Sequence, residues 1–284
     1  MRKRTRSEQL VKQARQAGVK SRKAASRLDM PWARRAPARF AREGIMLGLL
    51  APLIAVYIRR RQAGSDAFEG LEPPIVMVAN HASHLDTPVI LRTLPRRWRK
   101  RTVVAAAADY FYKSRIVGGA FSLVFNTVPL DRKGGGLKGA AAEHLHRLLE
   151  DRWSVLLFPE GTRSRDGGIG RLRAGAAVLA AEHDACILPV YVNGTHEAMP
   201  PGQSWPKRVH GKLFSRRHKV TVRFGKPIRP EPDEESRHVI ARVQSFFDQQ
   251  SGLLPALPPG DDTPAEPSNG GAVVDRAPAE SPRA

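Results

Sequence analysis

Short apolar runs alternate with longer amphipathic stretches between about residues 74 and 226. The runs predict strands at 75–79, 102–107, 122–130, 154–158, 187–192 and 220–224. The stretches between them predict helices at 88–94, 138–150 and 174–183. This alternation is typical of an α/β domain with a mostly parallel sheet flanked by helices. Because the last run has loops rather than helices as neighbours, we predict that it forms an antiparallel edge strand.

An uninterrupted apolar run precedes this domain at residues 44–58, and an Arg-Arg-Arg sequence follows it. As a helix this run would be about 22 Å long, which is short of the roughly 30 Å of a bilayer's hydrocarbon core. Basic residues flank it on both sides, so it lacks the charge asymmetry that orients a membrane span. We therefore predict a membrane-associating helix over residues 44–61. A helix buried in the core is the alternative.

Residues 1–43 form a basic arm. They contain fourteen Lys and Arg residues against three acidic residues, and the whole chain has a formal net charge of +20. Such a charge concentrates anions at the surface, so nucleic acid, anionic lipid and phosphorylated small molecules are the candidate partners. Trp32 and Phe40 are interleaved with arginines, which favours a membrane interface. A solvated tail is the alternative, since blocks of like charge are usually disordered.

The composition changes again near the other end of the chain. Residues 251–284 contain seven prolines and predict a disordered Pro-rich tail, which leaves residues 62–250 for the folded α/β domain. Cys186 is the one cysteine of the chain, so an intrachain disulfide and a cysteine-rich zinc site are excluded. This composition favours a reducing, cytosol-facing location.

The stretch 80-NHASHLD-86 follows the first predicted strand and concentrates polar side chains. His81 and Asp86 can meet only if the chain turns between them, because their spacing places them on different sides of a helix or strand. A loop leading from a strand into a helix supplies that turn, and α/β sheets bind ligands at such loops. Four interpretations remain open: a metal site that includes His84, a nucleophilic Ser83, a helix cap, and a His–Asp base pair.

Two further stretches place positive charge after predicted strands. In 158-FPEGTRS-164, Gly161 permits close backbone approach, and the Thr, Arg and Ser that follow can donate several hydrogen bonds to one anion. This pattern favours a phosphate cradle, and a solvated turn is the alternative. In 128-VPLDR-132 a guanidinium again lies beside an acid at a strand end, where a surface ion pair is the alternative.

These three stretches and 187-ILPVYVNGT-195 resemble the four sequential blocks of the glycerolipid acyltransferase family, whose best-known members are the 1-acylglycerol-3-phosphate acyltransferases. The resemblance covers roughly residues 70–225, and the His-x4-Asp motif followed by Phe-Pro-Glu-Gly-Thr-Arg-Ser is its most specific part. It implies transfer of a fatty acyl group to a glycerophosphate hydroxyl. The co-substrate would be acyl-CoA or acyl-carrier protein, with no metal or other cofactor.

The resemblance also implies roles for individual residues. His81 matches the catalytic base that takes the hydroxyl proton, and Asp86 matches its orienting partner. The implied acceptor-binding residues are Arg132, Glu160, Gly161, Thr162 and Arg163. Because a carboxylate beside an anion would repel it, we expect Glu160 to orient an arginine or a hydroxyl group. His84 matches a variable position and is expected to have no essential role.

The chain departs from the family after the third block. It reads 172-LRAG-175 where many members have Phe-Lys-x-Gly, so Arg173 keeps the positive charge while the aromatic side chain is lost. The fourth block, with Pro189, is expected to shape the acyl or thioester side of the site.

We therefore expect an acyltransferase that acylates the sn-2 hydroxyl of 1-acylglycerol 3-phosphate to give phosphatidic acid. Its expected partners are an anionic membrane surface, a lysophospholipid acceptor and an acyl thioester donor, at the cytoplasmic face of the cell membrane as a peripheral or monotopic protein. No nucleic-acid partner is expected, since the arm lacks a recognised reading motif. The alternatives are another acceptor (glycerol 3-phosphate, another lysophospholipid or a glycolipid) and a non-catalytic basic protein that binds membranes or nucleic acid.

Overall fold

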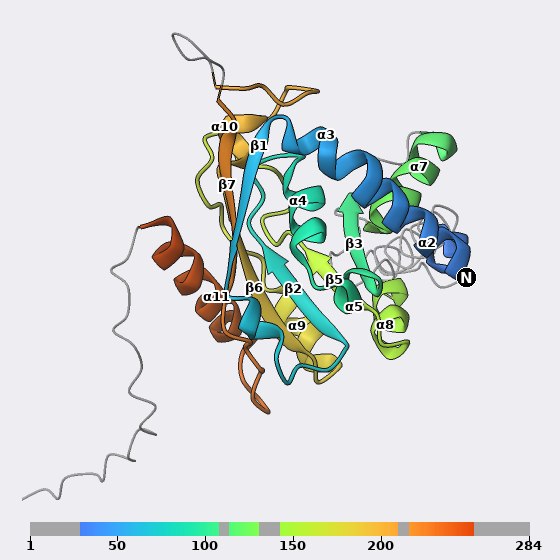
Figure 1. The fold of residues 1–284 in the computed structure, drawn as a ribbon. Coiled ribbons are helices and arrows are strands. Elements are labelled where there is room, and N and C mark those ends of the chain that lie inside the picture. Colours follow the sequence, from blue (N-terminus) through green and yellow to red (C-terminus); the bar gives the residue numbers. More distant parts are fainter. Residues whose placement is uncertain (1–28, 108–113, 131–142, 210–215, 253–284) are drawn as a thin grey trace, which may run out of the picture.

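The computed structural model describes residues 29–107, 114–130, 143–209 and 216–252. Within them the strands form a seven-stranded sheet in the order β1-β7-β6-β2-β5-β3-β4 (Figure 1). The strands are β1 (Ile58–Ala63), β2 (Ile75–Ala79), β3 (Thr102–Ala107), β4 (Thr127–Leu130), β5 (Ser154–Leu157), β6 (Cys186–Asn193) and β7 (His218–Phe224). Only the β6–β7 pair is antiparallel among these strands. The predicted α/β fold with a mostly parallel sheet is therefore confirmed.

Helices cover both faces of the sheet (Figure 1). One face carries α8 (Glu143–Glu150), α9 (Gly175–Glu182) and α11 (Ser236–Ser251), and the other carries η2 (Ile45–Leu50), α4 (Asp86–Thr93), α5 (Arg96–Arg99) and α10 (Thr195–Ala198). The remaining helices are η1 (Pro31–Arg34), α2 (Ala36–Gly44), α3 (Ala51–Ala55), η3 (Ser65–Phe68) and α7 (Arg115–Phe125). Ile75 and Met77 of β2 face the second group, whereas Val76 and Val78 face the first. This double burial explains why β2 is a continuous apolar run.

The predicted strand at 122–130 is wrong over its first half. Residues up to Phe125 belong to α7, and the strand β4 begins only at Thr127. Asn126 ends the helix in a left-handed conformation with φ 55°, and its side-chain amide donates to the Thr102 carbonyl at 2.8 Å. Short apolar runs fit a helix or a strand equally well, so periodicity alone did not separate the two.

The strand β1 corrects two predictions. Arg59, Arg60 and Arg61, which we expected to close the apolar helix, lie in β1, so the helical segment ends at Ala55 and not at residue 61. Because β1 pairs with β7 in parallel, β7 is antiparallel to β6 but is not an edge strand. A charged strand carries no apolar alternation, and charges on an edge strand protect it from pairing with other chains.

The last part of the basic arm packs against the domain through a buried arginine. Arg42 is 4% exposed, and its guanidinium donates to the carbonyls of Ala33 at 2.7 Å, Ser122 at 3.0 Å and Leu123 at 2.8 Å. Two of these carbonyls lie in the last turn of α7, where a helix favours a cation. Burial lowers the pKa of Arg42 to about 10, so the group stays charged at neutral pH.

The helical segment from Ala36 to Ala55 has two different faces. Leu50 and Ile54 pack against the core, whereas Leu49 and Leu53 are exposed. One face therefore belongs to the domain, and the other presents apolar side chains to its surroundings. Within the described ranges, no helix combines the length and apolarity that crossing a bilayer requires.

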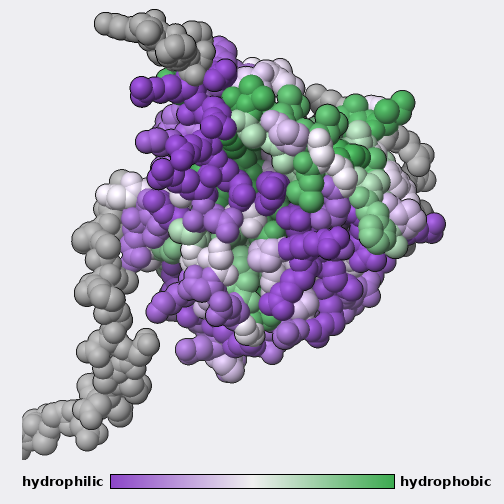
Figure 2. Space-filling model, viewed as in Figure 1, coloured by the Kyte–Doolittle hydropathy of each residue, from purple (hydrophilic) through white to green (hydrophobic). Residues whose placement is uncertain are grey.

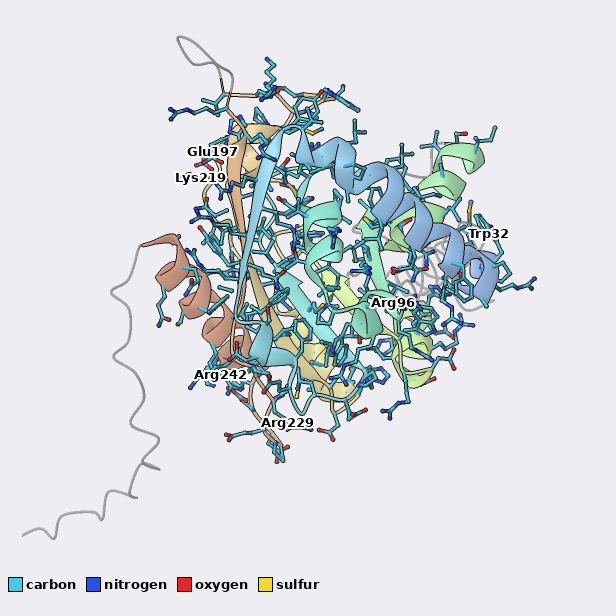
Figure 3. The ribbon with its side chains drawn as sticks, viewed as in Figure 1. Trp32, Arg96, Glu197, Lys219, Arg229 and Arg242 are labelled. Atoms are coloured by element: carbon cyan, nitrogen blue, oxygen red, sulfur yellow. The ribbon has the colours of Figure 1, made fainter. Side chains whose placement is uncertain are left out.

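Most of the large apolar side chains exposed in the described residues belong to the segment from η1 to α3 or to α7, and we call the exposed set the apolar face. It consists of Trp32, Phe40, Leu47, Leu49, Leu53, Val56, Ile116, Val117, Trp205 and Val209. Figure 2 shows apolar side chains gathered where Figure 1 places α3 and α7. In Figure 3, Trp32 lies at the α2 end of the molecule, on the side opposite the charged residues Lys219, Arg229 and Arg242.

Candidate active site

His81 and Asp86 come together in the loop between β2 and α4. The Nδ1 atom of His81 lies 2.8 Å from Oδ2 of Asp86. Asp86 is fully buried, whereas the His81 side chain keeps 19% of its surface exposed. The helix α4 begins at Asp86, two residues before the predicted start at Pro88. The turn between the two residues therefore makes the dyad possible.

The Asp86 carboxylate accepts several hydrogen bonds besides that of His81. The backbone N–H groups of Ala82 and Ser83 each donate to Oδ2 at 2.8 Å, and the Thr195 hydroxyl donates to Oδ1 at 2.5 Å. An ionised carboxylate only accepts hydrogen bonds, so it suits a site lined by donors. With Asp86 ionised, Nδ1 of His81 carries the proton and Nε2 keeps a lone pair.

The Phe-Pro-Glu-Gly-Thr-Arg-Ser segment holds His81 from its other side. The Glu160 carboxylate accepts from the His81 backbone N–H at 2.8 Å, and the Ser164 N–H donates to the His81 carbonyl at 2.7 Å. The Phe158 ring stacks on the imidazole, with ring centroids 4.1 Å apart and an interplanar angle of 24°. The third block therefore fixes both main-chain polar groups and the ring plane of His81.

Glu160 has partners other than those we predicted. We expected an arginine or a hydroxyl, but its two carboxylate oxygens accept from the backbone N–H groups of His81 and, at 2.9 Å, Gly170. A Cβ atom at Gly170 would lie 2.8 Å from the carboxylate, so a side chain there would disturb it. Burial raises the pKa of Glu160, and these two amide donors oppose the rise. Main-chain partners of this kind are not visible in a sequence.

The expected acceptor-binding residues lie beside the dyad, except for Arg132, which falls outside the described residues. Gly161 has φ +75°, and a Cβ atom built on it would lie 3.1 Å from the Arg173 guanidinium carbon. Gly161, Thr162, Arg163 and Arg173 all line the same cavity as His81. Three of these residues carry hydrogen-bond donors on their side chains, so this part of the cavity suits an anion.

His84 also lines this cavity and differs in character from His81. Burial lowers its pKa to about 4, and the nearby Arg163 guanidinium adds to the effect. His84 therefore stays neutral at physiological pH. Among the described residues, no group of three or more His, Cys, Asp or Glu side chains is placed to hold a metal ion.

The cavity has a volume of about 1210 Å³ and extends from this polar end to an apolar end. The apolar lining includes Ile54 of α3, Ala106 of β3 and Phe125 of α7. Because β5 lies between β2 and β3, and neighbouring strands are about 5 Å apart, the β3 wall lies roughly 10 Å from the end of β2 that carries His81. The cavity can therefore hold a polar group and an apolar chain at the same time.

Comparison with known proteins assigns the domain to a family. A model of the acyltransferase family matches residues 55–193, a range that contains His81, Asp86 and the whole third block.

The chain carries an acyltransferase-family domain.

Curated relatives of this acyltransferase domain share part of their length with the chain. The 1-acyl-sn-glycerol-3-phosphate acyltransferase LPAT1 of Arabidopsis thaliana is 33% identical over 140 residues, which are 47% of this chain and 37% of the relative. An N-acylphosphatidylethanolamine synthase of Arabidopsis thaliana is 32% identical over 191 residues, which are 60% of this chain and 64% of the relative. The chain thus spans between about a third and two thirds of the length of these two relatives.

A solved structure shares the fold. The crystal structure of the 1-acyl-sn-glycerophosphate acyltransferase PlsC from Thermotoga maritima matches with a TM-score of 0.57 at 19% identity, over 81% of this chain and 84% of that one. This match confirms the predicted fold, whereas the predicted family is supported by the family model.

Sequence reasoning missed the contacts that tie the dyad loop of this acyltransferase domain to the end of β6. Asn80 exchanges two hydrogen bonds with the backbone of Val192, at 2.9 and 2.7 Å. The Ser83 hydroxyl donates to the Met199 carbonyl at 2.7 Å. Thr195 bonds to Asp86 as described above. One signal in the sequence could have indicated these contacts. The first and fourth blocks both lie at the end of a predicted strand, and neighbouring parallel strands end at the same edge of a sheet.

Proposed function

We propose that the protein transfers a fatty acyl group from acyl-CoA or acyl-carrier protein to the sn-2 hydroxyl of 1-acylglycerol 3-phosphate, with His81 as general base. The placement of His81 carries this proposal. Its Nδ1 is bonded to the buried Asp86, and its ring lies at the wall of a cavity that has donor-rich and apolar parts. A base, an anion site and a chain site are the parts that acylation of a lysophosphatidic acid requires.

The proposed reaction moves one proton and exchanges one bond. Nε2 of His81 takes the proton of the acceptor hydroxyl as its oxygen attacks the thioester carbonyl. The C–O bond forms, the C–S bond breaks, and the imidazolium returns the proton to the thiolate that leaves. Asp86 holds the imidazole in the required tautomer and stabilises its positive charge. No covalent bond between enzyme and acyl group is needed.

The two substrates divide the cavity between them in this proposal. Thr162, Arg163 and Arg173 bind the acceptor phosphate, and Arg132 joins them if it follows the family resemblance. The acyl chain lies along the apolar wall. Sites for a single drug-sized ligand measure roughly 300–1,000 Å³. A cavity of about 1210 Å³ is large enough to suit two substrates rather than one.

The replacement of His81 by alanine tests the base assignment. General-base catalysis contributes about 10²- to 10⁴-fold, so His81→Ala should lower kcat by at least about a hundredfold while the melting temperature stays near that of the wild type. His238→Ala, on the exposed side of α11, is the matched control and should keep full activity. A His81→Ala enzyme that retains acyl transfer within about tenfold of the wild type would overturn the assignment.

The apolar face is the proposed contact with an anionic membrane surface at the cytoplasmic side of the cell membrane. Leu53 and Trp205 belong to the apolar face and also line the cavity, so the cavity reaches the surface there. The arm that precedes α2 is strongly basic, and each Lys or Arg near an anionic bilayer contributes about 1 kcal/mol. A peripheral or monotopic attachment would bring the cavity next to its lipid substrates.

A further inference from the structure

Thr195 contacts Asp86 of the dyad, but the proposed reaction gives Thr195 no role. It is the first residue of α10 and is 1% exposed. Its hydroxyl donates to Oδ1 of Asp86 at 2.5 Å, whereas His81 and the backbone N–H groups of Ala82 and Ser83 all bond to Oδ2. Thr195 is therefore the described partner of the other carboxylate oxygen.

A bond to the second oxygen constrains the carboxylate in a way that the other three do not. The carboxylate can turn only about its Cβ–Cγ bond, and the three donors on Oδ2 oppose that rotation at one oxygen alone. The Thr195 hydroxyl holds Oδ1, so the rotation is opposed at both oxygens and Oδ2 stays directed at Nδ1 of His81. A hydroxyl that bonds to a carboxylate acts as the donor, and such charge-assisted bonds are short and strong.

The chain delivers Thr195 to this position through a turn that only glycine can make. β6 ends at Asn193, and Gly194 has φ +89°. A Cβ atom at Gly194 would lie 2.0 Å from the carbonyl oxygen of Lys219 in β7, so any side chain would collide with the backbone. This turn directs the next residue beneath the dyad loop.

The same segment is anchored to the dyad loop on both sides of Thr195. Asn80 bonds to Val192 before the turn, and Ser83 bonds to Met199 after it. Because Asn80, Ser83 and Asp86 are all buried, these bonds are shielded from water. Hydrogen bonds therefore hold the segment from Val192 to Met199 against the loop that carries His81 and Asp86. Thr195 is the residue of this segment that contacts the Asp86 carboxylate.

We propose that Thr195 is a positioning residue for the reaction, acting through Asp86 to hold His81 in the orientation that accepts a proton. This inference rests on the proposed role of the dyad. The expected cost of losing one hydrogen bond to a charged group corresponds to about ten- to a hundredfold in rate. The cost should fall on kcat, because Thr195 contacts the dyad and not the substrate cavity wall.

Two substitutions at this position separate the hydroxyl from the rest of the side chain. Thr195→Val keeps the shape and removes the donor, so kcat should fall by about ten- to a hundredfold while KM changes less than about twofold. Thr195→Ser restores the donor and should recover most of kcat. The matched control is Thr102→Val, since Thr102 is also 1% exposed and donates its hydroxyl to the Trp98 carbonyl at 2.8 Å. This control should leave kcat within about twofold.

A double substitution shows whether Thr195 works through Asp86. In an Asp86→Asn background, Thr195→Val should lower kcat by less than about twofold further, because the carboxylate that it positions is gone. Wild-type kcat in Thr195→Val, an equal loss in Thr195→Ser, or a full additional loss in the Asp86→Asn background would each overturn the inference. His81→Ala separates this from the proposed function: if that variant stays active, the dyad itself is wrong, whereas an inactive His81→Ala with an active Thr195→Val rejects only the positioning role.

Discussion

The two ends of the cavity are built on different physical principles. At the polar end, hydrogen bonds of 2.5 to 2.9 Å fix His81, Asp86 and Glu160, and each bond requires a particular donor or acceptor. At the apolar end, side chains from α3, β3 and α7 form a wall by packing, which has no preferred direction. Hydrogen bonding therefore prescribes residue types at one end, and packing prescribes only size at the other. Substitutions should accordingly affect the rate at the polar end and substrate choice at the apolar end.

Of the four positions whose substitution tests this comparison, Glu160 should give the largest change when it is replaced by alanine. The substitution removes the acceptor of the His81 and Gly170 backbone N–H groups, which would leave the dyad loop less well fixed. We expect kcat to fall by about ten- to a hundredfold. Glu160→Gln keeps one acceptor oxygen and should lie between alanine and wild type. Steady-state kinetics check this order, and a kcat for Glu160→Ala within about twofold of wild type would contradict the positioning role.

Ala106→Phe tests the apolar end. Ala106 is buried in β3 and lines the cavity, so a larger side chain should shorten the space for the acyl chain. Excluding two methylene groups forfeits about 1.6 kcal/mol, which is more than tenfold in kcat/KM for a long-chain donor. Short-chain donors should be used as before.

A series of acyl-CoA donors of increasing length measures this effect, with Ala241→Phe on the exposed side of α11 as the control. If Ala106→Phe lowered kcat/KM equally for short and long donors, the β3 wall would not determine the chain-length preference.

Leu49→Ser tests the apolar face at a residue that does not line the cavity. Leu49 is 64% exposed, and taking its side chain out of the membrane interface should cost about 1 kcal/mol, or about fivefold in vesicle affinity. Sedimentation with anionic phosphatidylglycerol vesicles measures the loss, and activity on detergent-dispersed substrate should not change. Ala241→Ser provides the control, and undiminished vesicle binding by Leu49→Ser would argue against this surface.

His84 should give the smallest effect, and one that appears in stability rather than in rate. Because burial lowers its folded-state pKa from 6.5 to about 4, protonation favours the unfolded chain. Stability should therefore fall as the pH drops from about 6.5 to 4, by about 1 kcal/mol once partial exposure is allowed for. Melting temperatures at pH 5 and 7 should differ less in His84→Gln than in wild type. An identical pH dependence in both proteins would contradict this explanation.

The sequence predicted the parts of the molecule where one residue type is physically required. The strands β2 and β3 were predicted at their observed bounds because buried parallel strands must be apolar throughout. The contact between His81 and Asp86 was predicted because a loop between a strand and a helix lets two residues at this spacing meet. The helix α7 was missed because its apolar run fits a strand as well.

Other features depend on the fold and leave no local signal. The strand β1 carries three arginines, so it lacks the alternation that marks a strand with one buried face. Thr195 and the amide partners of Glu160 meet the dyad only because distant strand ends converge at one edge of the sheet. Such contacts become predictable only once the order of the strands is known.

Measuring which acceptor the enzyme acylates is the most direct test of the proposed function. The chain resembles both a 1-acyl-sn-glycerol-3-phosphate acyltransferase and an N-acylphosphatidylethanolamine synthase, and their names indicate different acceptors. Labelled acyl-CoA would be supplied with 1-acylglycerol 3-phosphate, glycerol 3-phosphate, lysophosphatidylethanolamine or phosphatidylethanolamine, and the lipid products resolved. We predict phosphatidic acid from 1-acylglycerol 3-phosphate, with a kcat/KM at least about tenfold above every other acceptor. Labelled product from phosphatidylethanolamine alone, or no transfer to any glycerophosphate, would contradict the account.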